Sequence, residues 1–368
     1  MTKINKTLLS DVIQYLPEIE KFAPKENVPI QKDELFICAL GFEQRCLTIP
    51  RKLNKLGYKT KSSVYVKYNT NQDDNYVNLQ ELQSNLERFS DEVLKPLEID
   101  SQTFANDLRT ILNGLKSKNN KPPSVTLDIS VFANRLILSS LNTLLESDID
   151  LKILYSEADI YHPTKDEYDQ NPQKWKGEEE LGLERGVNTA IISSEYPGQH
   201  LEIMPHFIII FPCFKKERSK AIIAKVDPSL LIEPDHKVAW IIGDPHLKKD
   251  KWRKGAMREI NDISEEEIQY EVSTFNYTET LKILEKLYQQ KWNKCNITLA
   301  LNGSKMQAIG STLFCYLHPD VRVVFAIPKE YNAKQYTKNC RDTWIINIES
   351  TKKLRMILDS IGNISISK

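Results

Sequence analysis

The chain has 368 residues, and its 50 basic and 50 acidic side chains give a formal net charge of zero at pH 7. This length suits two domains of ordinary size. The balanced charge excludes the basic excess of a general nucleic-acid coat protein, although a local patch for nucleic acid remains open. The six cysteines form no CxxC pair, and no apolar run reaches the length of a membrane span. We therefore expect a reduced, cytoplasmic protein that does not enter the membrane.

Helix and strand patterns alternate through the first half of the chain, as in a parallel sheet covered by helices. Apolar positions at helical spacing predict a helix over residues 7–22, and residues 75–118 predict two more. Buried strands are expected at ELFICALG, SSVYVKYN, SVTLDIS and LKILYSEA, and an amphipathic helix at FANRLILSSLNTLLES.

A polar stretch interrupts this alternation before it resumes in the second half. Residues 159–205 carry few periodic apolar positions and indicate a connection, with a short strand at TAIIS. The strands expected after it are at 206–214, 237–246, 267–275, 296–305 and 321–328, with helices at 217–226, 247–261, 276–292 and 306–317.

The two halves resemble each other at one constant offset. TLDISVFANRLILSSL from Thr126 lies opposite TLALNGSKMQAIGSTL from Thr298 (298 − 126 = 172), and Phe42 lies opposite Phe214 (214 − 42 = 172). Two matches in the same order favour an internal duplication over the alternation of strands and helices that all α/β domains share. We predict an α/β fold of two Rossmann-like lobes with parallel sheets flanked by helices: lobe 1 at 1–165, a polar connection at 166–205 and lobe 2 at 206–368.

Polar residues at the strand ends are the candidates for ligand binding, because open parallel sheets bind ligands at the carboxyl ends of their strands. A guanidinium at Arg45 could hold a phosphate or a carboxylate, or it could form an ion pair between the lobes. Asp128 and Ser130 could contact a ligand or cap a helix. The predicted ligand-binding set is Glu43, Arg45, Asp128 and Ser130, with Arg218, Asn302, Gly303, Ser304, Lys305 and Gln307 in the second half.

The stretch NGSKMQAIG follows a predicted strand and opens a predicted helix. Lys305 stands at the start of that helix, where its charge opposes the helix dipole, and an anionic ligand would relieve the conflict. Gly303 lets the backbone approach a ligand or simply turn. The P-loop spacing GxxxxGK is absent.

Catalytic candidates come from both halves: Asp128, Glu157, Asp244 and His246. They could serve as general acids or bases, with Lys305 stabilising charge. Gly-Asp-Pro-His around His246 is also ordinary turn chemistry. GxSxG, HExxH and CxxC motifs are missing and the histidines are scattered, so we expect neither a metal site nor a cofactor.

The stretch LALNGSKMQAIG resembles the CRISPR-associated Rossmann-fold (CARF) sensor domains, which carry a strand, a Gly/Thr/Ser-Lys turn and then a helix. Paired domains of this sort occur in bacterial anti-phage defence proteins. The resemblance implies binding of a nucleotide second messenger between paired lobes, with Gly303, Ser304 and Lys305 at the ligand. The first half departs from the pattern, because VFAN replaces the Gly-Ser-Lys turn. That departure puts a symmetric pair of sites in doubt.

The leading hypothesis is therefore a cytoplasmic nucleotide-sensing module of a bacterial anti-phage defence system. No effector domain of known signature is visible, so we expect a partner protein or a homodimer to act with it. One alternative is a nucleotide or nucleic-acid hydrolase, such as a nuclease-like effector. The other is a protein interaction scaffold that keeps the repeat without a binding site.

Overall fold

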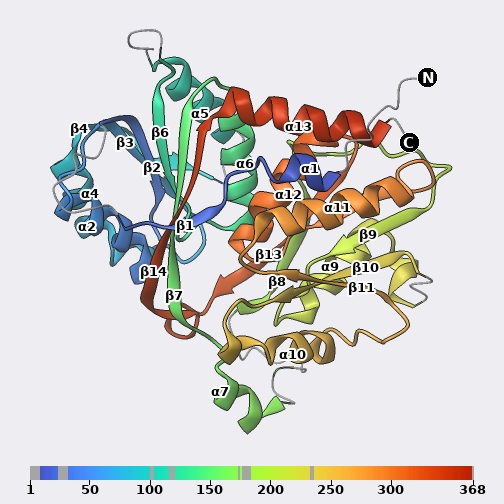
Figure 1. Ribbon diagram of the computed structural model, residues 1–368. Coiled ribbons are helices and arrows are strands. Elements are labelled where there is room, and N and C mark those ends of the chain that lie inside the picture. The colour runs from blue at the N-terminus through green and yellow to red at the C-terminus, as the bar shows by residue number, and fades with distance from the viewer. Residues whose placement is uncertain are drawn as a thin grey trace, which may run out of the picture. The chain divides into compact units, whose positions relative to one another are not determined.

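Two mostly parallel sheets flanked by helices carry the fold (Figure 1), which confirms the predicted α/β class and its two lobes. The computed structural model describes residues 9–23, 32–99, 103–115, 121–172, 175, 184–232 and 236–366. Within these ranges, no helix has the length and apolar character needed to cross a membrane.

The first sheet has eight strands in the order β1-β14-β7-β6-β2-β3-β4, and β5 also pairs with β3. Its five main parallel strands, counted along the chain, lie in the order 3-2-1-4-5 of a Rossmann half. These five are β2 (Asp33–Ala39), β3 (Thr60–Lys67), β4 (Ser90–Val93), β6 (Ser124–Asp128) and β7 (Asp150–Tyr161). The sheet is extended by β1 (Ile19–Lys21), β5 (Leu97–Glu98) and β14 (Thr337–Ser350), which runs antiparallel to β7.

The second sheet has six strands in the order β11-β10-β9-β12-β13-β8, and its parallel strands repeat the order 3-2-1-4-5. They are β9 (His206–Ile210), β10 (Val238–Asp244), β11 (Ile268–Ser273), β12 (Asn296–Ala300) and β13 (Arg322–Tyr331), with β8 (Glu184–Ile192) at the edge. The offset of 172 carries β6 onto β12 (124 + 172 = 296) and the start of β7 onto that of β13 (150 + 172 = 322). The structure therefore repeats in the register that the sequence predicts.

Helices connect the strands in both halves. The first half contains α2 (Thr48–Lys55), α3 (Gln72–Tyr76), α4 (Leu79–Phe89), α5 (Phe104–Asn113), α6 (Asn134–Leu145) and α7 (Lys165–Gln170). The rest of the chain supplies α1 (Leu9–Ile13), α9 (Lys216–Val226), α10 (Arg253–Ile260), α11 (Tyr277–Lys291), α12 (Lys305–Leu317) and α13 (Thr351–Ile366). The apolar pattern predicts α6 correctly as a helix. Its buried residues surround most of the helix rather than one amphipathic face; they include Leu136, Ile137, Leu138, Leu141, Leu144 and Leu145.

The chain forms two compact units whose boundaries differ from the contiguous division expected from the sequence. The eight-stranded unit comprises Pro17–Tyr168 and Glu330–Lys353, and the six-stranded unit holds Asp169–Lys329 together with the parts before Pro17 and after Lys353. The reason is β14, which pairs with β7 and so returns part of the expected second lobe to the first sheet. The short strand expected at TAIIS is present as part of β8, which begins earlier, at Glu184, and pairs at the edge of the second sheet.

Several local expectations also change. The helix expected over 7–22 is described as α1 followed by β1, since Pro17 cannot continue a helix that needs its N–H. The region expected to form two helices contains α3, α4 and α5, with β4 and β5 between the last two.

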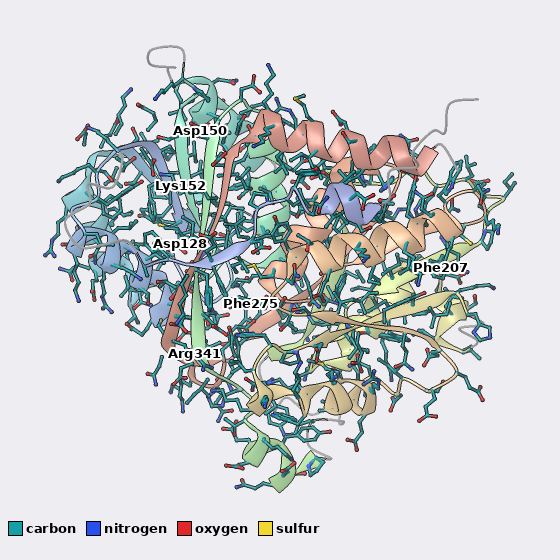
Figure 2. All side chains as sticks on the ribbon, in the orientation of Figure 1. Asp128, Asp150, Lys152, Phe207, Phe275 and Arg341 are labelled. Atoms are coloured by element: carbon teal, nitrogen blue, oxygen red, sulfur yellow. The ribbon has the colours of Figure 1, made fainter. Side chains whose placement is uncertain are left out.

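A buried ionic network lies at the amino ends of the first sheet's strands. Asp33 is fully buried, and its carboxylate accepts hydrogen bonds from Lys152 Nζ at 2.7 Å, Tyr58 OH at 2.7 Å and Thr126 Oγ1 at 2.5 Å. Figure 2 labels Lys152 near the start of β7, whereas Asp128 marks the other end of the neighbouring strand β6. The network therefore stands apart from the carboxyl ends, where ligands bind in such sheets.

Candidate functional site

The switch point of the eight-stranded sheet lies between β2 and β6, where the strand order reverses. The loops that follow these two strands touch each other. A Cβ atom on Gly41 would lie 3.2 Å from the side chain of Val131, so a larger residue would push the loops apart. This contact brings the predicted residues after β2 close to those after β6.

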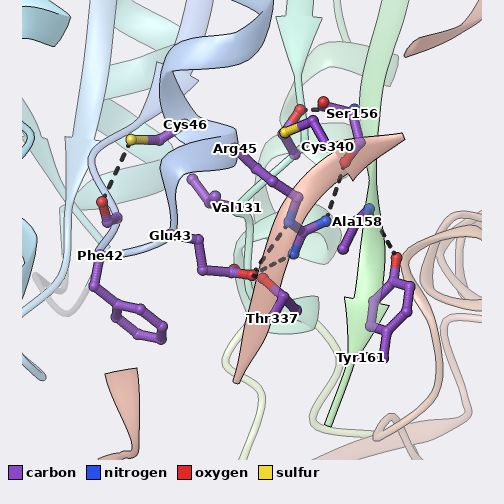
Figure 3. A network of polar contacts seen from close by, with 12 residues as sticks. Phe42, Glu43, Arg45, Cys46, Val131, Ser156, Ala158, Tyr161, Thr337 and Cys340 are labelled. Atoms are coloured by element: carbon purple, nitrogen blue, oxygen red, sulfur yellow. Dashed lines mark hydrogen bonds and ion pairs between the residues drawn. The ribbon is translucent and has the colours of Figure 1, made fainter. Parts of the chain in front are cut away.

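Glu43 and Arg45 form a buried ion pair just after β2 (Figure 3). Arg45 donates to Glu43 Oε2 from Nη2 at 2.6 Å and from Nε at 3.2 Å, and Thr337 Oγ1 donates to the same oxygen. These three hydrogen bonds from described residues converge on Oε2. The second oxygen, Oε1, is thus left as an acceptor in a side chain that is 8% exposed.

Arg45 also anchors the loop to the fifth parallel strand. Its Nη1 donates to the carbonyl oxygen of Ser156 in β7 at 3.0 Å, and its guanidinium lies 6.0 Å from the ring centre of Tyr161. Burial acts to lower the pKa of Arg45, but the adjacent Glu43 carboxylate raises it above the ordinary value. Arg45 is therefore a permanent buried cation held within one unit, rather than an ion pair between lobes.

Asp128 and Ser130 form a second polar group after β6. Asp128 Oδ1 accepts from the backbone N–H of Ser130 at 2.9 Å and from the Ser130 hydroxyl. The same hydroxyl accepts from the backbone N–H of Ser156 at 2.8 Å. The main chain of Ser156 thus joins this pair to Arg45, and all four ligand-binding residues predicted in the first half belong to one network.

Three partly exposed aromatic rings cluster at Phe42, the residue that precedes Glu43. Phe42 lies 6.3 Å from Tyr331 and 5.7 Å from Tyr336 between ring centres, and the two tyrosines are 5.5 Å apart. The carbonyl of Phe42 accepts from Asn78 Nδ2 at 3.2 Å, which helps to hold its loop. The sequence did not predict Tyr336 and Thr337 at this site, because their place depends on β14.

Glu157 and Tyr161 lie farther along β7. Glu157 is 2% exposed and accepts from the indole N–H of Trp344 in β14 at 3.1 Å. The hydroxyl of Tyr161 is 2.7 Å from that of Tyr155, and burial raises the pKa of both phenols. These phenols are therefore neutral at ordinary pH.

The NGSKMQAIG turn in the six-stranded unit forms a complete capping box. Ser304 Oγ accepts from the backbone N–H of Gln307 at 3.2 Å, and Gln307 Oε1 accepts from that of Ser304 at 2.8 Å. The Ser304 hydroxyl donates to the carbonyl of Thr274 at 2.6 Å. A Cβ atom on Gly303 would lie 3.0 Å from the ring of Phe211, so this glycine admits a neighbouring side chain. Both capping side chains thus serve the start of α12 itself.

Asn302 and Lys305 flank this capping box. The backbone N–H of Asn302 donates to the carbonyl of Ala300 at 3.1 Å, which turns the chain at the end of β12. Lys305 is the first residue of α12 and is half-buried. The predicted residues of this turn therefore lie together, at the carboxyl end of the fourth parallel strand.

Replacing Ser304 with alanine is expected to lower the free energy of unfolding by about 1 kcal/mol, because a cap side chain satisfies an otherwise unpaired helix N–H. Urea titration followed by circular dichroism measures the change. Ser360 offers a matched control, since it is an exposed serine inside α13. Equal stabilities of Ser304→Ala and Ser360→Ala would show that the box contributes nothing.

Arg218 plays in the six-stranded unit a part like that of Arg45, although the offset of 172 places Arg45 on Glu217, one residue earlier (45 + 172 = 217). Each follows the first parallel strand of its sheet, and each donates to a carbonyl of the fifth: Arg218 Nη2 to Ala326 in β13 at 3.0 Å. The residue that corresponds to Glu43 carries the opposite charge, because the offset of 172 places Glu43 on Lys215 (43 + 172 = 215). The anchoring arginine is repeated, but the Glu43 carboxylate is not.

Asp244 and His246 lie at the end of β10 and just after it. Burial acts to raise the pKa of Asp244, but hydrogen bonds from Lys251 at 2.7 Å and from Lys254 lower it overall. His246 is exposed, and its ring centre lies 4.3 Å from that of Phe275. In the part of the chain that the structure describes, no group of three or more His, Cys, Asp or Glu residues is arranged to hold a metal ion.

No protein-family model matches the chain, and no curated protein matches it either.

Proposed function

We propose that the protein binds a nucleotide at the switch point of its eight-stranded sheet and acts as a nucleotide-sensing module. The observation that carries the proposal is that the partly exposed ring of Phe42 and the carboxylate of Glu43, which Arg45 and Thr337 orient, both follow β2 at this sheet edge. In a doubly wound sheet this edge is the usual place of a ligand. The resemblance to CARF sensor domains supports the sensing role in bacterial anti-phage defence.

The Phe42 ring suits the flat face of a nucleobase, and the Glu43 carboxylate suits the polar edge of the base or the hydroxyls of the ribose. An aromatic ring stacks on any base and stabilises the complex by about 1–3 kcal/mol. Arg45 and Thr337 fix Glu43 through Oε2, so Oε1 can accept a hydrogen bond from an amino group of the base or from a ribose hydroxyl.

The start of α6 supports placement of the phosphate nearby. Its N-cap residue is Ala133, which has no side-chain oxygen, whereas the equivalent helix α12 carries the Ser304 capping box. Both helices have the positive end of their dipole at the carboxyl edge of the sheet. The Tyr68 hydroxyl accepts from the Ala133 N–H at 2.8 Å. An anion would be favoured beside it, at the N–H groups of the first turn of α6, where the N-cap side chain does not compete. Val131 connects this turn to Gly41 and so to Phe42.

Calorimetric titration against linear and cyclic nucleotides is the deciding experiment. We expect at least one to bind the full chain with a Kd below about 100 µM, which corresponds to about −5.5 kcal/mol. Absence of binding across the panel would overturn the proposal.

Lys305→Ala tests which half of the chain is used. With the site in the eight-stranded unit, this variant should bind within about threefold of the wild type, because Lys305 belongs to the other unit. A loss of binding with unchanged thermal stability would instead support the site that the NGSK turn predicts.

A further inference from the structure

A short segment bordering the proposed site is held at both ends by residues of the eight-stranded unit. We call residues Tyr331–Thr337 the strap; it includes the 3-10 turn η4 (Ala333–Gln335) and leads into β14. Its last residue donates to Glu43, and the carbonyl of Tyr336 accepts from the backbone N–H of His162 at 3.2 Å. Lys334 and Gln335 are exposed, so solvent lies on the outer side of the strap.

Asn71 holds the beginning of the strap with both ends of its side-chain amide. Nδ2 donates to the carbonyl of Tyr331 at 2.8 Å, and Oδ1 accepts from the Tyr331 N–H at 2.9 Å. This pairing reproduces the two-way exchange of a hydrogen-bonded residue pair in a sheet. Asn71 has a φ of 54°, a left-handed conformation that asparagine tolerates better than most residues, and Asp74 accepts from its Nδ2 at 2.9 Å.

The same short region also fixes the other side of the site. Asn78 follows α3, and its Nδ2 donates to the carbonyl of Gly41 at 2.8 Å. Asn71 and Asn78 thus hold the strap and the glycine loop, respectively, from one stretch of the chain. The rings of Phe42, Tyr331 and Tyr336 belong to the two segments that these asparagines hold, and a base would have to share their mutual contacts.

We propose that Asn71 is a positioning residue that latches the strap beside Phe42 and Glu43, and that a nucleotide enters and leaves when this latch opens. The inference rests on the proposed function, because it concerns access to the same site. Asn71 is well suited to this role because one side chain supplies both latch bonds. Loss of that side chain releases the beginning of the strap, while the bonds that join Thr337 to Glu43 and Glu43 to Arg45 remain.

The latch can be tested without a ligand by hydrogen–deuterium exchange on the full chain. Asn71→Gly removes the amide and keeps the positive φ available, so it adds no backbone strain. Exchange of the strap amides should become about tenfold faster or more, while amides of β2 exchange as in the wild type. Asn71→Asp keeps one acceptor for the Tyr331 N–H and should give a smaller increase. Unchanged exchange in Asn71→Gly would overturn the latch.

Asn339→Gly is the matched control, because Asn339 is an exposed asparagine of β14 with a φ of 55°. Its removal should leave strap exchange unchanged. If Asn339→Gly speeds strap exchange as much as Asn71→Gly does, the effect comes from general loosening and the latch is wrong.

Stopped-flow binding of methylanthraniloyl-labelled ATP and GTP tests the gating role. A latch that controls access predicts that Asn71→Gly raises the association and dissociation rate constants together, each about fivefold or more, with Kd within about threefold of the wild type. A rise in the dissociation rate alone would mean that Asn71 only supports the bound state, and gating would be overturned. If neither probe binds the wild type, gating of these nucleotides and their proposed binding both fail, whereas faster strap exchange would still identify the latch.

Discussion

Replacing Lys152 with methionine is expected to lower the free energy of unfolding by about 3 kcal/mol or more, the largest stability change we expect. Its ammonium group neutralises Asp33, whose side chain is 0% exposed. Removing one partner of a buried ion pair leaves an uncompensated charge, and such changes cost about 3–5 kcal/mol. Lys152 is itself 25% exposed, which places the expectation at the lower end of that range. Urea unfolding monitored by tryptophan fluorescence measures the effect.

Lys338→Met serves as the control, because Lys338 is an exposed lysine of β14 in the same sheet. It should change the free energy of unfolding by less than about 0.5 kcal/mol. The double variant Asp33→Asn with Lys152→Met should recover part of the loss, because no charge then remains buried. If Lys152→Met proves as stable as Lys338→Met, the hydroxyl groups of Tyr58 and Thr126 suffice to hold Asp33.

Phe42→Leu is expected to weaken nucleotide binding about tenfold or more. Leucine keeps an apolar side chain beside Tyr336 but removes the flat face on which a base would stack. Stacking on an aromatic ring stabilises a bound base by about 1–3 kcal/mol, which corresponds to about 5- to 150-fold in Kd. Calorimetric titration with the nucleotide that binds the wild type gives the difference.

Phe275→Leu makes the same chemical change in the six-stranded unit, where Phe275 packs on His246. It should bind the nucleotide as the wild type does. The opposite pattern, with binding lost in Phe275→Leu and kept in Phe42→Leu, would move the site to the other unit. Measuring the urea midpoint of both variants shows whether either loss reflects unfolding.

Local patterns in the sequence were sufficient for much of the fold. Apolar runs of strand length at β6 and β12, each followed by a helical pattern, are complete signals within about 20 residues, and their shared offset reveals the repeat. β14 could not be recognised in this way because its first half is polar, and its partner β7 lies 200 residues away (350 − 150 = 200 for the pair Ser350 and Asp150). The observed units depend on β14, whereas the expected boundaries followed the order of the chain.

The candidate site shows the same limit. Glu43 and Arg45 stand out in the sequence because polar residues at a strand end are easily recognised. Their pairing with each other, and the arrival of Thr337 from the far end of the chain, depend on tertiary contacts that no local pattern encodes. Asn71 carried only a weak signal, as one polar residue in the turn NTNQDDN. The NGSK turn is easily recognised in the sequence, but its residue types do not separate ligand binding from helix capping, because a ligand motif and a capping box can share them.

The pairing of β14 with β7 also has a consequence for the synthesis of the protein. A ribosome adds about 5–20 residues per second, so the 200 residues that separate Asp150 from its partner Ser350 take about 10–40 s to make. During that time β7 is an open edge, although six consecutive residues from Ile153 to Ala158 become buried in the finished sheet. Unpaired apolar edges invite association with other chains. The nascent chain is therefore most exposed to aggregation until β14 has emerged, and chaperones that shield β7 would act in that interval.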